Sequence, residues 1–216
     1  MKRAVLVLIL LLGCLAGTSL AQDETTSAVA QHRRILKIQR INRLYEAGKY
    51  EEALELLNKC QGEEAQDVNI LNMRGVVLGK LGKYDEAQKI LQRLLEENPS
   101  FHPAVYNLGD LLFAKGDYEA SLRFFETAYR NDPNNELVRF RLFLNFLVLG
   151  REREAAGVVA GMIPAGGTPA WYFVRAALAQ KRGETGQRNR DLALAREIYG
   201  EDECRDFKVA LKAAKF

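Results

Sequence analysis

An eleven-residue phrase occurs four times in this chain at a fixed interval. The copies are AGKYEEALELL at 47–57, LGKYDEAQKIL at 81–91, KGDYEASLRFF at 115–125 and LGREREAAGVV at 149–159, each 34 residues after the previous one. A fixed period of this size is the sequence signature of a repeat architecture, in which each structural unit packs on its neighbours. The period therefore constrains the fold more strongly than the composition does.

The spacing inside the copies indicates helices. Large apolar residues lie three or four positions apart, as on one face of a helix, and do not alternate as in a strand. The chain is 48% hydrophobic and 27% charged, so that it can bury a core and is not disordered as a whole. Its formal net charge of +3 gives no argument for a nucleic-acid partner, which requires a clustered basic surface. We therefore predict an all-α protein with no nucleic-acid partner.

Numbering each repeat so that its glycine falls at position 15 gives the repeats 34–67, 68–101, 102–135 and 136–169. The third repeat is the most regular, with Leu108 and Gly109 at positions 7 and 8, Tyr118 at 17, Ser121 at 20, Phe125 at 24, Ala128 at 27 and Pro133 at 32. The second repeat has the same kinds of residue, among them Gly75, Tyr84, Ala87, Leu91 and Pro99. With these matches the chain resembles the tetratricopeptide repeat (TPR) family over at least 34–169.

The resemblance implies a right-handed superhelical solenoid of antiparallel helix pairs, with helix A followed by helix B in each repeat. Small residues at positions 8, 20 and 27 let the two helices approach closely, and glycine at position 15 ends helix A. Asp117 is expected to cap the start of a helix B, and Pro99 and Pro133 to end helices. We expect about four to five repeats and a C-terminal capping helix.

The register slips by one residue after 169. Gly183 marks a further turn, but the segment after it lacks the usual alanine and aromatic residue. A last helix at roughly 202–214 has Phe207, Ala210 and Leu211 on one face. Because a solenoid needs atypical end units to cover its core, we interpret 170–216 as a degenerate fifth repeat and a capping helix.

The first 21 residues are typical of a signal peptide. A basic start, MKR, precedes the apolar run Ala4–Gly17, and Ser19 and Ala21 form a small-x-small cleavage site. We therefore expect an exported protein, periplasmic or secreted, with a flexible mature N-terminus at 22–33. An alternative is the sequence LLGC at 11–14, which resembles a lipobox and would make the protein an envelope lipoprotein acylated at Cys14. Membrane association is expected only through this N-terminal region.

No catalytic, metal-binding or cofactor-binding signature is present in the sequence. The two histidines, His32 and His102, belong to no metal motif. Cys60 lies at position 27, where repeats of this family pack a small residue, and a disulfide between Cys60 and Cys204 is not expected because several helix layers separate them. We therefore predict a protein that is not an enzyme and needs neither metal nor cofactor.

The resemblance further implies that helix A lines a concave groove through positions 2, 5, 9, 12 and 13. Partner contacts are accordingly expected from Asn42, Tyr45, Asn72, Val76, Tyr106, Asp110, Phe113, Phe140, Leu144, Leu147 and Phe173. Lysine is missing from position 5, and asparagine occupies position 9 only at Asn42, which argues against the carboxylate clamp of some TPR domains. The expected function is a protein-interaction module or scaffold that binds a partner peptide or helix.

Two features leave alternatives open. The groove becomes apolar toward the C-terminal half, and either a partner helix fills it or the chain's own C-terminal helices cover it. The first helix is basic, with Arg33, Arg34, Lys37, Arg40 and Arg43. Its outer face is either simply solvated or a docking surface for acidic lipid head groups or an acidic partner. In the lipoprotein alternative, the protein would act in outer-membrane assembly or secretion.

Overall fold

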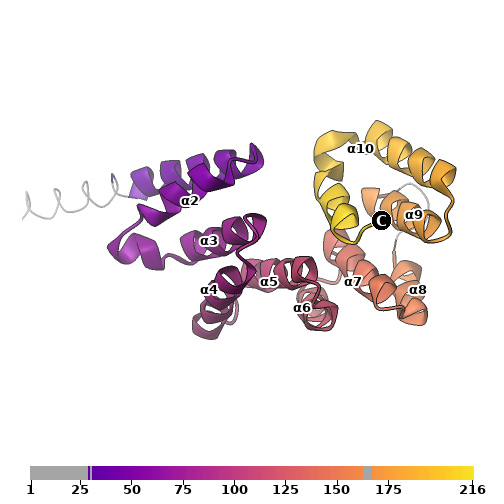
Figure 1. Cartoon of the computed structure of the whole chain (residues 1–216), viewed down its shortest axis with the longest axis horizontal. Helices are drawn as coiled ribbons and strands as arrows, with labels where there is room; N and C mark the ends of the chain where they lie inside the picture. Colours follow the sequence, from indigo (N-terminus) through magenta and orange to yellow (C-terminus); the bar gives the residue numbers. More distant parts are fainter. Residues whose placement is uncertain (1–28, 30, 163–166) are drawn as a thin grey trace, which may run out of the picture. The chain divides into compact units, whose positions relative to one another are not determined.

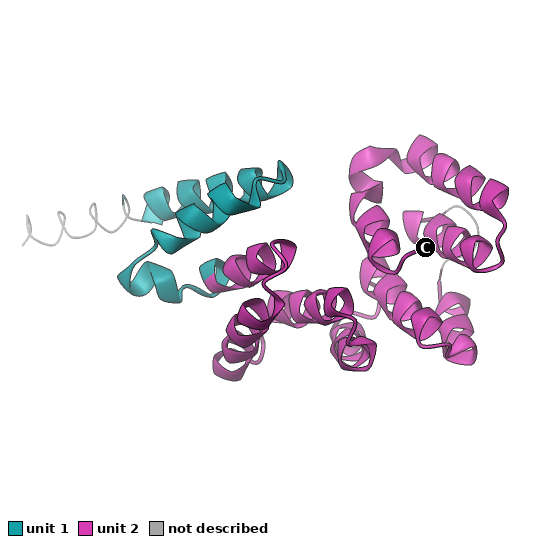
Figure 2. Cartoon of the chain, in the orientation of Figure 1, with its two compact units in different colours: residues 1–70 teal, residues 71–216 magenta. Residues whose placement is uncertain are grey.

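The computed structural model describes residues 29, 31–162 and 167–216, and the regular elements within these ranges are all helices (Figure 1). The predicted all-α fold is therefore confirmed. The chain divides into two compact units, 1–70 and 71–216 (Figure 2). The predictions for the signal peptide at 1–21, including lipidation at Cys14, fall outside the described residues.

The first unit contains a helix at 31–46, α2 (Tyr50–Asn58), the short 3-10 helix η1 (Gly62–Gln66) and the start of α3 (Val68–Lys80). Its core is formed by Ile41, Ala53, Leu57, Cys60 and Ile70, all at most 5% exposed. The predicted burial of Cys60 is thus confirmed. Residues 31–33, assigned by sequence to the N-terminal segment, are part of the first helix.

The second unit continues the alternation of A and B helices. After α3 it contains α4 (Tyr84–Glu97), α5 (His102–Lys115), α6 (Tyr118–Asn131), α7 (Glu136–Val148), α8 (Glu152–Ala160), α9 (Pro169–Lys181) and α10 (Thr185–Ala213). The A helices of this unit are α3, α5, α7 and α9. From α4 to α8 each helix packs on the next one, as expected for stacked helix pairs.

Glycine at position 15 has the predicted role. Gly82 lies just after the end of α3 with φ +75°, a left-handed conformation that other residues rarely adopt. The Lys83 amide then donates to the Leu78 carbonyl at 3.0 Å, and this bond caps the last turn of the helix. Equivalent glycines with positive φ come after the other A helices at Gly48, Gly116, Gly150 and Gly183.

The small residues at positions 8 and 20 also have the predicted role in the third repeat. A Cβ atom on Gly109 would lie 3.0 Å from the ring of Phe125, so that a larger residue would require the ring to shift away from α5. The Ser121 hydroxyl donates to the Gly109 carbonyl at 2.9 Å. At the start of α6, the Asp117 carboxylate accepts from the Ala120 amide, as predicted for a cap.

A break in the backbone divides α10 into two halves. Gly200 has φ 83° and ψ 171° inside the helix, and this separates 185–199 from 201–213. The first half packs along α9, and the second half turns back so that it also contacts α7 (Figure 1). The second half thereby lies over the A helices at the C-terminal end of the second unit.

Candidate partner-binding surface

The C-terminal part of the predicted groove is filled by the chain itself. The ring centroid of Phe207, on the second half of α10, lies 5.6 Å from that of Phe140 and 5.4 Å from that of Phe173. Phe140, Leu144 and Phe173 are 0% exposed, and Leu147 is 4% exposed. The sequence left open whether a partner helix or the chain's own C-terminal helices cover the groove, and in the structure the C-terminal helices cover it. These four residues are core residues here and are not open partner contacts.

Phe113 is also a core residue, although we expected it to contact a partner. It is 1% exposed, and its ring packs edge-on against Tyr118 of α6, with centroids 5.0 Å apart. The side chain points toward helix B of its own repeat, because a large ring at position 12 fills the space beside Tyr118. Its predicted role in binding is corrected accordingly.

The remaining predicted contacts are partly exposed. Asn72 and Val76 of α3, together with Tyr106 and Asp110 of α5, are half-buried in the second unit. The Asn107 amide donates to the side-chain oxygen of Asn72 at 2.8 Å, which fixes α3 against α5. In the first unit Asn42 and Tyr45 are half-buried as well, and the Tyr45 ring lies 5.6 Å from that of Tyr50.

Arg141 joins the half-buried residues into a polar network. Its guanidinium donates to the Asp110 carboxylate at 2.7 Å and to the Tyr106 hydroxyl at 3.3 Å. The arginine side chain is only 5% exposed, whereas that of Asp110 is 30% exposed. Sequence reasoning missed Arg141 because it lies at position 6. The signal for it was a cation between the large apolar residues Phe140 and Leu142 of α7.

Burial and the neighbouring charges shift the pKa values of Tyr106 and Asp110 in this network. Burial raises the pKa of Tyr106, and the negative charge of Asp110 raises it further. Burial also raises the pKa of Asp110, while the Arg141 guanidinium opposes that rise. The negative charge of Asp206, on the second half of α10, also raises the pKa of both groups. The helix that covers the apolar groove thus brings a negative charge close to the polar network.

A cleft of about 670 Å³ lies between α8 and α9. Whereas α4 packs on α5 and α6 packs on α7, the described residues of α8 and α9 make no comparable contact. The cleft has Phe143 and Leu147 of α7 at its base and small residues of α8 along one side. The reason is the length of α8, which has 9 residues where α4 and α6 have 14. The next helix A therefore lacks the last turn of helix B as a packing partner.

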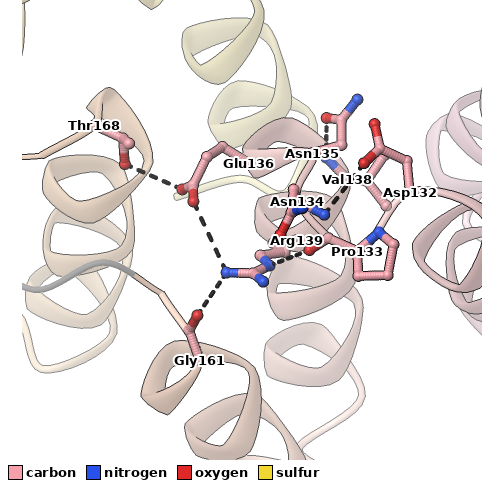
Figure 3. Close-up of polar contacts among 9 residues, drawn as sticks. All are labelled: Asp132, Pro133, Asn134, Asn135, Glu136, Val138, Arg139, Gly161 and Thr168. Atoms are coloured by element: carbon pink, nitrogen blue, oxygen red, sulfur yellow. Dashed lines mark hydrogen bonds and ion pairs between the residues drawn. The ribbon is translucent and has the colours of Figure 1, made fainter.

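Polar contacts join the end of α8 and the start of α9 to the start of α7 (Figure 3). Arg139 donates to the carbonyl of Gly161, just after α8, at 2.5 Å and to the carbonyl of Pro133 at 2.6 Å. Glu136 accepts from the hydroxyl of Thr168, just before α9, at 3.0 Å. The two helices are therefore held to α7. At the opposite end of the cleft, Lys181 at the end of α9 and Glu152 at the start of α8 form an ion pair at 2.6 Å, so that their two charges neutralise each other.

The described residues contain no group of His, Cys, Asp and Glu side chains that could hold a metal ion. Cys60 and Cys204 are both buried free thiols. Among the described helices, none combines the length and the apolar sequence that crossing a bilayer would require.

Comparison with known proteins identifies the repeats. The family model described as Tetratricopeptide repeat matches residues 72–136. Rhomboid protease GluP of Bacillus subtilis (strain 168) is 36% identical over 84 residues, which are 39% of this chain and 16% of that protein. The Hsp70-Hsp90 organizing protein of Triticum aestivum is 25% identical over 95 residues, 44% of this chain and 16% of that protein. The chain therefore spans only about a sixth of the length of these two relatives.

A solved structure agrees with the fold. The thermophilic TPR protein TTC0263 of Thermus thermophilus superposes with a TM-score of 0.65 at 22% identity, over 84% of this chain and 98% of that one. At this identity the likeness concerns the fold alone. The matches identify residues 72–136 as tetratricopeptide repeat sequence, and the positive-φ glycines and the small residues between helices A and B agree with this fold.

Proposed function

We propose that this chain is an exported protein-interaction module that binds a segment of a partner protein without catalysing a reaction. Tetratricopeptide repeats act in general by binding other proteins, which supports the proposed role as a protein-interaction module. The proposed binding surface consists of Asn72, Val76, Tyr106 and Asp110, on the A helices α3 and α5. We call these four residues the α3–α5 surface.

The observation that carries the proposal is the difference between the two halves of the groove in the second unit. The C-terminal half is closed, because Phe207 packs on Phe140 and Phe173. The α3–α5 surface remains half-exposed, and its Asp110 side chain is already ordered by a bond from Arg141. A rigid polar side chain loses little conformational entropy on binding. This surface is therefore suited to a polar or charged partner segment.

A photo-crosslinking experiment tests the proposed surface. A photoreactive residue at Val76, on α3, is expected to crosslink the physiological partner, and the same residue at the exposed Gln92 of α4 is not. The charge reversal Asp110→Lys tests a different part of the surface and is expected to abolish the crosslink. The circular dichroism spectrum shows whether this variant is still folded. Equal crosslinking from Val76 and Gln92 would contradict the proposed surface.

Export is a separate part of the proposal, and it rests on the sequence before residue 22. Mass spectrometry of the N-terminus after expression in a host with an export pathway distinguishes the alternatives. A mature chain that begins at Gln22 supports a soluble periplasmic or secreted protein. A chain that begins at an acylated Cys14 supports the envelope lipoprotein, which we would then connect with outer-membrane assembly or secretion. An intact N-terminus would contradict processing in either form.

A further inference from the structure

The first helix of the chain, at 31–46, exposes arginines and large apolar side chains together. Arg33, Arg40 and Arg43 are exposed, and Leu36 between them has 49% of its surface accessible. These residues lie in steps of three and four along the chain, which places them within about 80° around the helix axis. Ile35 is also 47% exposed, but it lies about 100° from Leu36 around the helix axis. We call Arg33, Leu36, Arg40 and Arg43 the arginine face.

The opposite side of the helix explains why the arginine face is turned outward. Ile41 is 1% exposed and belongs to the core of the first unit. Two other cations of the helix form internal ion pairs, Arg34 with Asp67 and Lys37 with Glu64. The helix is therefore fixed in rotation by its apolar side and by two charge pairs.

The three outward arginines have no ion pair with any residue that the structure describes. Five cationic residues in this helix are accompanied by a single acidic residue, Glu46. Two of the five cations are neutralised internally, and the positive charge that remains is concentrated on the arginine face. A surface of this kind attracts an anionic partner, and the side chain of Leu36 among the arginines provides apolar surface that becomes buried on binding.

We propose that the arginine face binds the surface of an anionic lipid bilayer. A helix that lies on a membrane combines arginine or lysine with large apolar side chains, which enter the boundary between head groups and acyl chains. Here the arginines would contact lipid phosphates, and the side chain of Leu36 would insert between the head groups. An acidic protein segment would pair with the arginines equally well but would leave the exposed Leu36 without a role. The exposed apolar side chain of Leu36 among the arginines therefore favours the bilayer.

The position of the helix in the chain agrees with this assignment. In the lipoprotein form, Cys14 lies 19 residues before Arg33, and a chain extends by at most about 3.5 Å per residue. A bilayer that holds acylated Cys14 is therefore within reach of the arginine face. The proposal adds a membrane contact to the N-terminal one that the sequence suggested. It does not depend on the α3–α5 surface, so that either proposal can fail without the other.

Vesicle binding by the chain from Gln22 onward tests the proposal. This chain retains every described residue and lacks the apolar run, which would enter vesicles by itself. We expect it to float with vesicles of equal parts phosphatidylglycerol and phosphatidylcholine, and not with phosphatidylcholine alone. Each cation near an anionic surface contributes about 1 kcal/mol, so the triple variant R33Q/R40Q/R43Q is expected to bind about a hundredfold more weakly.

A matched triple variant provides the control. K59Q/K83Q/R123Q removes the same charge from three exposed positions elsewhere and is expected to keep its affinity within about twofold. Leu36→Ser is expected to lower vesicle affinity while it leaves the dependence on salt unchanged. An unchanged unfolding midpoint in all variants shows that the fold is intact, because the substituted side chains are exposed.

Three outcomes would overturn the proposal. The first is a wild-type chain that does not bind the anionic vesicles. The second is an equal loss of binding in both triple variants, which would show that only the net charge matters. The third is binding to soluble polyglutamate through the same arginines without binding to vesicles, which would identify an acidic protein segment as the partner.

Discussion

The rings of Phe173 and Phe207 stack with their centroids 5.4 Å apart and their planes inclined by 27°. Phe173 belongs to α9 and Phe207 to the second half of α10, after the break at Gly200. This contact, together with the one to Phe140, holds the last helix of the chain against the A helices. The C-terminal helix is therefore part of the core of the second unit.

Replacing Phe207 with alanine tests how firmly this helix is held. Loss of a buried phenylalanine side chain typically lowers the free energy of unfolding by about 3–5 kcal/mol, and we expect Phe207→Ala to fall in this range. Val209 is on the same half of α10 and is 42% exposed, so Val209→Ala is expected to change the free energy by less than about 0.5 kcal/mol. Urea denaturation of both variants measures the difference. Equal effects would show that the aromatic contact contributes little.

The period of the sequence predicted what each repeat shares, but not what closes the end of the solenoid. Gly82 and Gly109 were predictable because each satisfies a local requirement, a left-handed turn or a close approach between two helices. The contact between Phe140 and Phe207 joins residues far apart in the chain, and no spacing rule links them. The sequence predicted a capping helix at roughly 202–214 and left open whether the C-terminal helices cover the apolar groove. The structure shows that the second half of α10 covers it.

The cleft between α8 and α9 was not predictable for a different reason. The repeat pattern gives the bounds of the fourth repeat, 136–169, but does not specify where its helix B ends. The structure ends α8 at Ala160, directly before Gly161. Arg139, whose bond to the Gly161 carbonyl helps to define the gap, occupies position 4 of the fourth repeat, where the repeat pattern has a large apolar residue.

The glycine at position 8 allows a second test, which compares two substitutions of the same kind. A Cβ atom on Gly75 would lie 2.6 Å from Cγ of Leu91, a residue that is 0% exposed. Overpacking of a core typically costs about 1–3 kcal/mol, so Gly75→Ala is expected to destabilise the chain despite the higher helix propensity of alanine.

Gly157 in α8 is the matched control, because no described atom lies within 4 Å of the position that its Cβ would take. Gly157→Ala is expected to raise the free energy of unfolding by about 0.5–1 kcal/mol, since alanine is the better helix former. Thermal unfolding measures both variants. A shift of both midpoints in the same direction would contradict the steric role of Gly75.

Asp110 should make stability depend on pH in an unusual direction for a carboxylate. Burial raises its pKa above the ordinary 3.8, and Arg141 opposes this only in part. The folded chain then binds this proton more tightly than the unfolded chain does. The contribution of Asp110 to stability is therefore fully present below pH 3.8 and is lost as the pH rises through the raised pKa. Asp110→Asn is expected to flatten this part of the curve of unfolding free energy against pH.

Asp85 provides a comparison of opposite sign. A hydrogen bond from Lys115 lowers the pKa of Asp85, so its contribution to stability is present above the ordinary value and is lost as the pH falls through the lowered pKa. In wild type, Asp85 makes the free energy of unfolding fall as the pH falls. The Asp85→Asn variant is therefore expected to lose this part of the dependence of unfolding free energy on pH, which is opposite in sign to that of Asp110. Carboxyl titration by NMR gives an independent check, since Arg141→Met is expected to raise the pKa of Asp110 further. A fall in that pKa would refute our account of the network.

Arg139 connects the end of α8 to the start of α7. Arg139→Gln removes a charged donor from the carbonyls of Gly161 and Pro133. Hydrogen bonds that involve a charged group contribute about 1.5–3 kcal/mol each when buried. Because these two bonds are near the surface, we expect a total loss of about 1–2 kcal/mol.

The effect of Arg139→Gln should be local, because the bonds hold the end of α8 rather than its packing on α7. Amide hydrogen exchange is expected to accelerate in the last turn of α8 and to stay unchanged in α6. Arg153→Gln is the control, since Arg153 is exposed on α8 and makes no contact in the network of Figure 3. If both variants retained the protection of the wild type, the bonds of Arg139 would not hold α8, and the width of the cleft would have to follow from the short length of α8 alone.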